Sequence, residues 1–266
     1  MRQKTVTRPV SCKGIALHTG EVSFLEFRPA EENSGIYFLH NGGRVDANAK
    51  NITSTNRGSA LSSISTVEHV LSAVYGCGIE NVELFLEGPE PPALDGSAKG
   101  FVDLLRRAGI KEQAAESRYI SVKHLIRVES GDSFVEISPL DHLAIEALID
   151  YSHTIAGVVT AKYDELKDDF EKNIAPARTF GLLEEVEALK KAGLAKGASL
   201  KNAIAITKTG YSSPLRFDNE LARHKILDII GDMALAGGRI RGKIVSHKGG
   251  HKLNIELARR LINASS

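Results

Sequence analysis

The sequence predicts an α+β protein made of two similar domains, residues 1–115 and 116–266. Strand-like and helix-like patterns occur in both halves, and 266 residues suffice for two ordinary domains. In addition, residues 20–29, GEVSFLEFRP, resemble residues 131–139, GDSFVEISP, with one residue deleted. Ser23 and Ser133 are 110 residues apart, close to half the chain length, so we interpret the similarity as a duplication.

The first half predicts strands separated by turns and two helices. Strands are expected at residues 22–27, 35–39 and 81–86, which are rich in apolar residues and bounded by Pro, Gly or Asn. Helices are expected at residues 66–75, which end before two glycines, and at residues 100–108. Residues 111–117 are the predicted linker between the two domains.

The second half predicts a similar mixture. Strands are expected at residues 119–128, 133–138 and 143–149, followed by a helix at 184–191 and a strand at 203–207. Residues 221–235 form the longest amphipathic pattern and predict a helix. The last predicted strand covers residues 243–246.

Composition limits the classes of function. Lys and Arg number 34 against 33 Asp and Glu, so no excess of charge favours nucleic acid as a partner. The cysteines, Cys12 and Cys77, form no CxxC pair, which favours a reducing compartment. The N-terminal segment has no signal-peptide pattern, and no run of 18 apolar residues predicts stable membrane insertion. We therefore expect a cytoplasmic protein.

His224, Asp228 and Asp232 recur at every fourth position of the longest predicted helix. At about 100° per residue they form one stripe along the helix. On periodicity alone, a solvated face is the simpler interpretation. The alternative is a metal site, because a His and a carboxylate one turn apart can bind the same ion.

Residues Ser65, Glu68 and His69 also have two interpretations. Ser65 and Glu68 have the spacing of a capping box, which would assign Glu68 to the start of a helix. Alternatively, His69 binds a metal and Glu68 acts beside it as a general base. Further along the chain, Lys248-Gly249-Gly250-His251 could form a turn, bind a phosphate, or present His251 as a general acid.

Six motifs in order give these residues a common context. They are Leu17-His18-Thr19-Gly20, Thr66-Val67-Glu68-His69, Leu94-Asp95-Gly96-Ser97-Ala98, Ala177-Arg178-Thr179-Phe180, Arg223-His224-Lys225 continuing to Asp228 and Gly231-Asp232, and Gly250-His251 with Asn254. Together they resemble the UDP-3-O-acyl-N-acetylglucosamine deacetylases, which carry out the committed step of lipid A synthesis. The motifs run from residue 17 to residue 254, so the resemblance covers nearly the whole chain.

The resemblance implies a fold and a set of roles. The fold is two α+β domains with helices sandwiched between their sheets. Zinc would be bound by His69, His224 and Asp228, although iron(II) suits the same ligands. The other implied roles are Glu68 as general base, His251 as general acid, Asp232 as the carboxylate that orients His251, Thr179 at the oxyanion, and Phe180, Lys225, Tyr151 and His18 in substrate binding.

The substrate implied is a small molecule, an acylated UDP-amino sugar, and the chain is expected to be a monomer. The first domain would supply Glu68 and His69. The second would supply the other metal ligands, His251 and an insert that binds the acyl chain and the nucleotide. Lys252, beside the general acid, and a poor match after Asp150 depart from the family pattern. They leave open a sister amidohydrolase for another N-acetylated sugar nucleotide, or a protein that only binds a sugar nucleotide or lipid.

Overall fold

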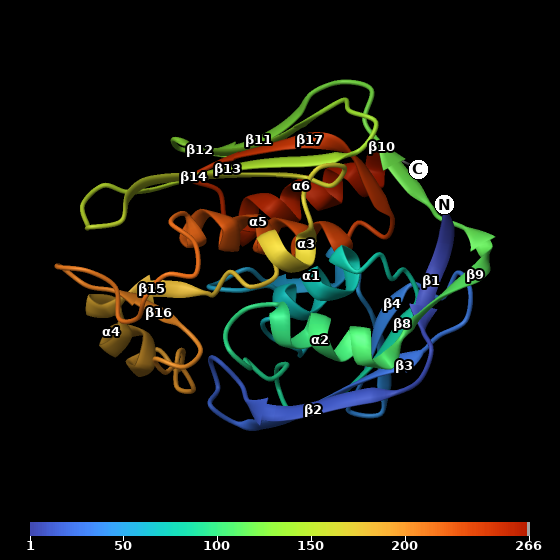
Figure 1. Ribbon diagram of the computed structural model, residues 1–266, viewed down its shortest axis with the longest axis horizontal. Coiled ribbons are helices and arrows are strands. Elements are labelled where there is room, and N and C mark those ends of the chain that lie inside the picture. The colour runs from blue at the N-terminus through green and yellow to red at the C-terminus, as the bar shows by residue number, and fades with distance from the viewer. Residues whose placement is uncertain (265–266) are drawn as a thin grey trace.

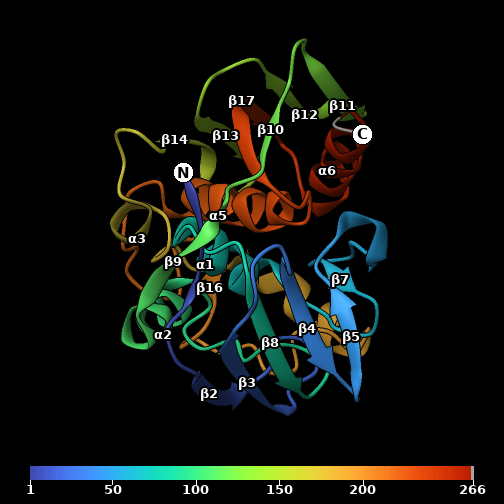
Figure 2. The same ribbon diagram turned by 90° about the vertical axis from the view of Figure 1, so that its right-hand side faces the viewer.

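The computed structural model describes residues 1–264, which form two β-sheets with helices between them (Figures 1 and 2). The first sheet has the strand order β2-β3-β8-β4-β5. Its strands are β2 (Val10–Ile15), β3 (Val22–Pro29), β4 (Ile36–His40), β5 (Gly43–Asp46) and β8 (Val82–Glu87). Only β4 and β8 are parallel neighbours in this sheet.

The second sheet has the strand order β11-β12-β17-β13-β14, and β10 also pairs with β17. These strands are β10 (Tyr119–Ser121), β11 (Ile126–Ser130), β12 (Ser133–Ser138), β13 (Leu143–Tyr151), β14 (Gly157–Asp164) and β17 (Arg239–His247). Along its strand order, β13 and β17 are parallel and the other neighbours antiparallel.

The two sheets have the same topology. When β2, β3, β8, β4 and β5 are matched with β11, β12, β17, β13 and β14, both the order and the strand directions agree. The two similar sequence segments form β3 and β12, which are equivalent strands in this match. The prediction of two similar α+β domains is therefore confirmed, while the boundary at residue 115 stays a prediction.

The main helices lie between the sheets (Figure 1). They are α1 (Glu68–Gly76), α2 (Lys99–Ala108), α5 (Glu220–Ala234) and α6 (His251–Ala264). Helices α1 and α5 precede the equivalent strands β8 and β17, and the two helices pack against each other. At their crossing, a Cβ on Gly231 would lie 2.0 Å from the carbonyl oxygen of Glu68, so this approach requires glycine.

Short elements complete the fold. They are β1 (Arg2–Val6), η1 (Ala49–Asn51), β6 (Ile52–Ser54), β7 (Ala60–Leu61), β9 (Ile110–Glu116), α3 (Phe170–Asn173), β15 (Phe180–Leu182), η2 (Leu183–Glu185), α4 (Val186–Lys191) and β16 (Ile204–Ile206). β1 pairs with β9, β6 with β7, and β15 with β16. The lobe that contains α4 projects beside the helical layer (Figure 1).

Several segments differ from the sequence predictions, and strands β1, β2, β5 and β14 were not predicted at all. The predicted linker, 111–117, is mostly strand β9, whose partner β1 comes from the far N-terminus. The single strand predicted at 119–128 is two strands, because β10 pairs with β17 whereas β11 pairs with β12 at the sheet edge. Helix α6 was not predicted, since the two glycines before His251 were interpreted as a turn or loop.

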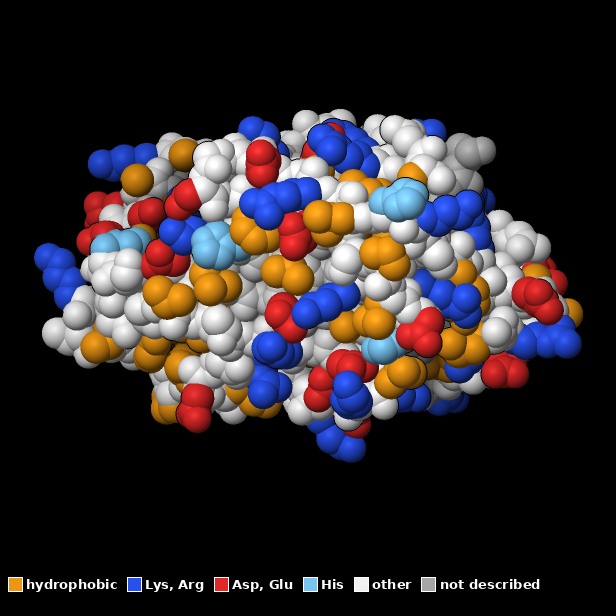
Figure 3. Space-filling view, turned by 90° about the horizontal axis from the view of Figure 1, so that it is seen from above, with side chains coloured by type: hydrophobic (Ala, Val, Ile, Leu, Met, Phe, Trp, Pro, Cys, Tyr) orange, Lys and Arg blue, Asp and Glu red, His pale blue; other side chains and the backbone are white. Residues whose placement is uncertain are grey.

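The outer face of the second sheet carries interspersed charges of both signs (Figure 3). Glu146, for example, pairs with Lys162 and Lys243 from neighbouring strands. This sheet therefore buries one face against the helices and exposes the other to solvent. None of the described helices is long and apolar enough to cross a membrane.

Candidate functional site

Helices α1 and α5 bring the three predicted metal ligands together. The Nε2 atoms of His69 and His224 lie 3.7 Å and 3.3 Å from Oδ1 of Asp228. One ligand atom from each residue can be chosen so that all lie within 4.8 Å of one another. All three side chains are buried, so the interpretation of the α5 stripe as a solvated face is wrong.

The donor set fits a divalent metal ion. Ligands about 2.0–2.2 Å from a tetrahedral zinc stand roughly 3.3–3.6 Å apart, close to the separations found here. Oδ1 of Asp228 is buried and has no hydrogen-bond partner among the described residues. Nδ1 of His224 is 3.0 Å from the carbonyl oxygen of Ala177; if it donates there, the Nε2 lone pair is free for a metal.

Electrostatics keeps these ligands in the protonation states that bind a metal. Burial and the neighbouring His224 lower the pKa of His69 to about 3, and burial also lowers that of His224. Burial alone would raise the pKa of Asp228, but His224 and Lys225 hold it well below its usual range. Two neutral imidazoles and one carboxylate result.

Glu68 is the first residue of α1, and its carboxylate points into the helical layer rather than capping the helix. The N-cap residue is Val67, and no side chain caps this end. Oε2 of Glu68 instead accepts a hydrogen bond from the backbone N–H of Ser59 at 2.9 Å. The capping-box interpretation of Ser65 and Glu68 is therefore wrong.

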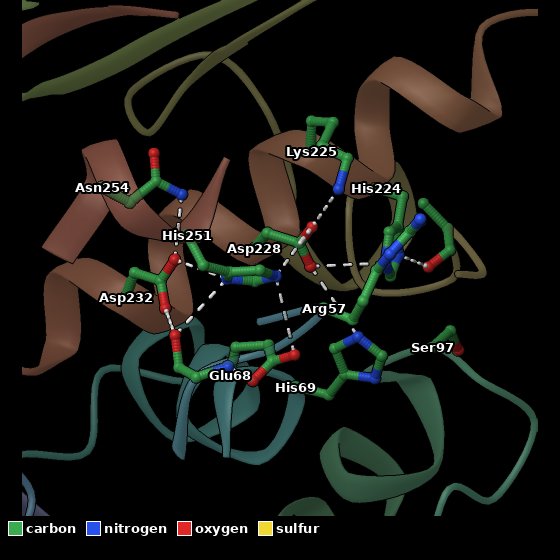
Figure 4. Close-up of polar contacts among 12 residues, drawn as sticks. Arg57, Glu68, His69, Ser97, His224, Lys225, Asp228, Asp232, His251 and Asn254 are labelled. Carbon is green, nitrogen blue, oxygen red and sulfur yellow. Dashed lines mark hydrogen bonds and ion pairs between the residues drawn. The ribbon is translucent and has the colours of Figure 1, made fainter. Parts of the chain in front are cut away.

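His251 is the first residue of α6 and faces Glu68 across the site (Figure 4). Its Nδ1 lies 2.8 Å from Oδ2 of Asp232, and its Nε2 lies 3.7 Å from Oε1 of Glu68. Asn254, one turn further along α6, donates to the same Oδ2 at 2.9 Å. Asp232 thus fixes the orientation of the imidazole through Nδ1 and leaves Nε2 facing the cavity.

The base and acid candidates have shifted pKa values. Burial raises the pKa of Glu68 to about 7, with the charges of Asp232 and Asp228 adding to the effect. Burial alone would lower the pKa of His251, but Asp232 and Glu68 raise it to about 10. Near neutral pH, Glu68 can therefore accept a proton, while His251 carries one.

A cavity of about 310 Å³ joins these groups to solvent. Besides Glu68, His251 and the three candidate ligands, its lining includes Thr179, Phe180, Tyr151 and Lys225. The Phe180 ring lies 5.7 Å from that of Tyr151 and 6.0 Å from that of His224. Lys225 donates to Oδ2 of Asp228 at 2.8 Å, so its ammonium lies beside a candidate metal ligand.

His18 is placed differently from the other predicted substrate residues. Among the described residues, Leu17 lines the cavity and His18 does not. The ring of His18 lies between two segments: Nδ1 accepts from the N–H of Ala195, and Nε2 is 3.2 Å from the carbonyl oxygen of Arg57. Arg57 does line the cavity, and it pairs with Glu185 at 2.8 Å.

A buried ion pair holds the loop that carries Thr179. Glu220, at the start of α5, accepts hydrogen bonds from the guanidinium and backbone N–H of Arg178 and from the N–H of Arg216. Glu220 is fully buried and Arg178 nearly so. This pair fixes residues 177–179, which supply the carbonyl oxygen of Ala177 to His224 and the side chain of Thr179 to the cavity.

Sequence reasoning missed several supporting residues. Ser59 and Gly58 were not singled out, and Asn254 was named only as part of a motif, although all three lie against the catalytic candidates. A Cβ on Gly58 would lie 2.9 Å from Oε1 of Glu68. The position of Asn254 beside His251, three residues earlier, could have been inferred from helical spacing, had α6 been predicted. No local pattern marks Ser59.

Comparisons with known proteins find the same family along nearly the whole chain. A family model described as LpxC, UDP-3-O-acyl N-acetylglycosamine deacetylase, matches residues 3–263. The chain is 39% identical over 274 residues to a UDP-3-O-acyl-N-acetylglucosamine deacetylase of Nitratiruptor sp., covering 100% of this chain and 92% of that one. Proteins of the same name from Geobacter sp. (38% identical, 98% and 88% covered) and Wolinella succinogenes (39%, 98% and 91%) are similar to it as well.

Proposed function

The chain belongs to the UDP-3-O-acyl N-acetylglycosamine deacetylase family, and we propose that it hydrolyses the N-acetyl group of a UDP-3-O-acyl-N-acetylglucosamine in lipid A synthesis. The products would be acetate and the free amine. The observation that carries the proposal is one cavity lined by three candidate metal ligands, a base and an acid. A protein that only binds a sugar nucleotide or lipid needs neither Glu68 nor His251.

We propose His69, His224 and Asp228 as the ligands of one zinc ion. When bound, such a metal polarises a carbonyl oxygen and lowers the pKa of water. The buried, unpartnered Oδ1 of Asp228 and the neutral imidazoles support this ligand set. Because iron(II) suits two His and one Asp about as well, elemental analysis of the purified protein is needed to identify the metal.

The proton transfers follow from the two groups that face each other. Glu68 takes a proton from the attacking water, and the raised pKa of its carboxyl makes it a better base than an exposed glutamate. His251, held by Asp232 at Nδ1, donates the proton on Nε2 to the leaving nitrogen. The Thr179 hydroxyl, which lines the same cavity, would donate to the oxyanion.

The substrate residues are proposed on weaker local patterns. Tyr151, Phe180 and Lys225 line the cavity, which supports a role for each of them in binding the sugar nucleotide. His18 does not line the cavity, so it would act through Arg57, whose carbonyl oxygen lies 3.2 Å from its Nε2. The monomeric state and the cytoplasmic location stay predictions.

The direct test is acetate release from the acylated UDP-sugar, measured before and after chelation and again after zinc is restored. A panel of N-acetylated UDP-sugars, with and without the 3-O-acyl chain, tests the substrate. Release that depends on the acyl chain and on metal supports the proposal. Faster release from another N-acetylated sugar nucleotide would indicate the sister enzyme, and binding without release would indicate a non-catalytic protein.

A further inference from the structure

Ser59 contacts both halves of the candidate catalytic machinery. It lies between β6 and α1, 9 residues before Glu68 and 192 residues before His251, and it is fully buried. Its backbone N–H donates to Oε2 of Glu68 at 2.9 Å. Its hydroxyl donates to Oδ1 of Asp232 at 2.6 Å and lies 3.4 Å from Nδ1 of His251.

These bonds form a continuous chain from the base to the acid. The chain runs from Glu68 through the N–H and hydroxyl of Ser59 to Asp232, and from the other oxygen of Asp232 to His251. The carboxylate of Asp232 is bound at both oxygens, since Asn254 and His251 occupy Oδ2 and Ser59 occupies Oδ1. Removing the Ser59 hydroxyl would leave Oδ1 without a described partner and allow the carboxylate to rotate.

The surrounding backbone keeps Ser59 in this position. Gly58 lets the loop approach Glu68, because a Cβ there would contact Oε1 at 2.9 Å. The carbonyl oxygen of Ser59 accepts from the N–H of Val67, which ties the loop to the first turn of α1. Ser59 is therefore fixed to the helix that carries the base, while its hydroxyl reaches the helix that carries Asp232.

We propose that Ser59 is a positioning residue that fixes the separation of Glu68 and His251 through Asp232. The inference rests on the proposed deacetylase function. In that reaction Glu68 acts on the attacking water and His251 on the leaving nitrogen, so their separation matters. Oε1 of Glu68 lies 3.7 Å from Nε2 of His251. Because a misplacement of about 1 Å costs on the order of 10² in rate, a rigid link between base and acid favours turnover rather than binding.

The test is Ser59→Ala, which keeps the N–H bond to Glu68 and removes only the hydroxyl. We expect kcat to fall by about 10–10² with KM changed by less than about 2-fold, since the misplacement affects the proton transfers. Metal content, measured by elemental analysis, should stay at the wild-type level. Ser59→Thr, which restores a hydroxyl, should recover most of the lost kcat.

Ser72→Ala is the matched control. Ser72 is equally buried, lies in α1, and its hydroxyl has no hydrogen-bond partner among the described residues. It should have a wild-type kcat. If both serine variants lose kcat equally, the effect comes from repacking of a buried site and the proposal is wrong.

A double mutant separates positioning from a general structural role. If Ser59 acts through His251, then adding Ser59→Ala to His251→Ala should lower kcat by less than about 2-fold, because the group being positioned is already absent. Losses that multiply in the double mutant would overturn the proposal, as would a normal kcat in Ser59→Ala. Absence of acetate release from the wild-type protein would instead reject the proposed function.

Discussion

The residues that hold the catalytic candidates differ from those around the mouth of the cavity. The first group, here the buried scaffold, consists of Ser59, Asp232, Asn254, Arg178 and Glu220. The second, here the rim, consists of His18, Arg57, Tyr151 and Glu185. Every residue of the buried scaffold is at most 9% exposed and makes at least one side-chain hydrogen bond given above. In the rim, the side chains of Arg57 and Glu185 are 49% and 37% exposed.

This difference in burial implies a difference in rigidity between the two groups of residues. A buried, hydrogen-bonded group is held in one orientation, and breaking its bonds leaves an unpaired polar atom that water does not reach. An exposed ion pair exchanges readily for water or for an incoming ligand. We therefore expect the proposed proton-transfer groups to be pre-positioned and the rim to rearrange around a substrate.

The largest expected effect is removal of a metal ligand. His224→Ala and Asp228→Ala should each lose bound metal and acetate release together, because each removes one of three ligands from a buried site. Elemental analysis and the deacetylation assay on the same preparations check this. His142→Ala serves as the control, since His142 also lies beside two carboxylates, Asp141 and Asp164, but on another part of the fold. Full metal content in either ligand variant would exclude that residue as a ligand.

Next in size is Glu68→Gln. The amide oxygen can still accept the N–H of Ser59, so the fold and metal content should be retained. Turnover should fall by roughly 10²–10⁴, the range for loss of general-base catalysis. The measurements are turnover and thermal midpoint of this one variant. Nearly normal turnover would instead fit a purely structural role, in which Glu68 only holds the backbone of Ser59.

A residue of the site could be predicted from sequence where its pattern is local, and could not where its role depends on a contact with a distant part of the chain. The stripe of His224, Asp228 and Asp232 follows from helical periodicity, and Glu68 and His69 are adjacent, so both could be singled out from sequence. Their convergence could not, because it requires the crossing of α1 and α5 at Gly231. Only the family resemblance supplied it.

Ser59 and α6 were not predicted from sequence for two other reasons. Ser59 acts across 173 residues to Asp232, in a serine-rich loop where no spacing distinguishes it. Residues 251–264 have a helical pattern of apolar positions, but the glycines at 249 and 250 indicated a turn or loop at this point of the chain. The twofold repeat of strand order was predictable in outline because one strand kept its sequence in both halves.

Within the buried scaffold, Glu220→Gln should lower stability. It leaves the guanidinium of Arg178 buried without its charge partner, which costs about 3–5 kcal/mol of unfolding free energy. Although burial raises the pKa of Glu220, hydrogen bonds from Arg178 and from backbone N–H groups bring it below the ordinary value of 4.5. A lowered folded pKa means that this stabilisation is present above pH 4.5 and is lost as pH falls through the folded pKa.

Denaturant unfolding of Glu220→Gln and wild type at neutral pH and in acid tests both statements. The difference between the two proteins should be largest at neutral pH and should shrink in acid. Glu185→Gln, on the rim, is the comparison variant and should change unfolding free energy by less than about 1 kcal/mol. A difference between Glu220→Gln and wild type that grows as pH falls would contradict the assigned sign.

The smallest effect is expected at the rim pair Arg57–Glu185. This prediction tests whether the rim is held less firmly than the buried scaffold. Both side chains are more than a third exposed, and Arg57 has a left-handed backbone, with φ of 62°, that arginine rarely adopts. The ion pair should therefore contribute only about 0.2–1 kcal/mol, and less at high salt. A double-mutant cycle of Arg57→Ala and Glu185→Ala, measured by unfolding at low and high salt, gives this coupling directly. Coupling above about 2 kcal/mol that persists in salt would mean that the rim is held as firmly as the buried scaffold. The proposed adaptability of the rim would then be wrong.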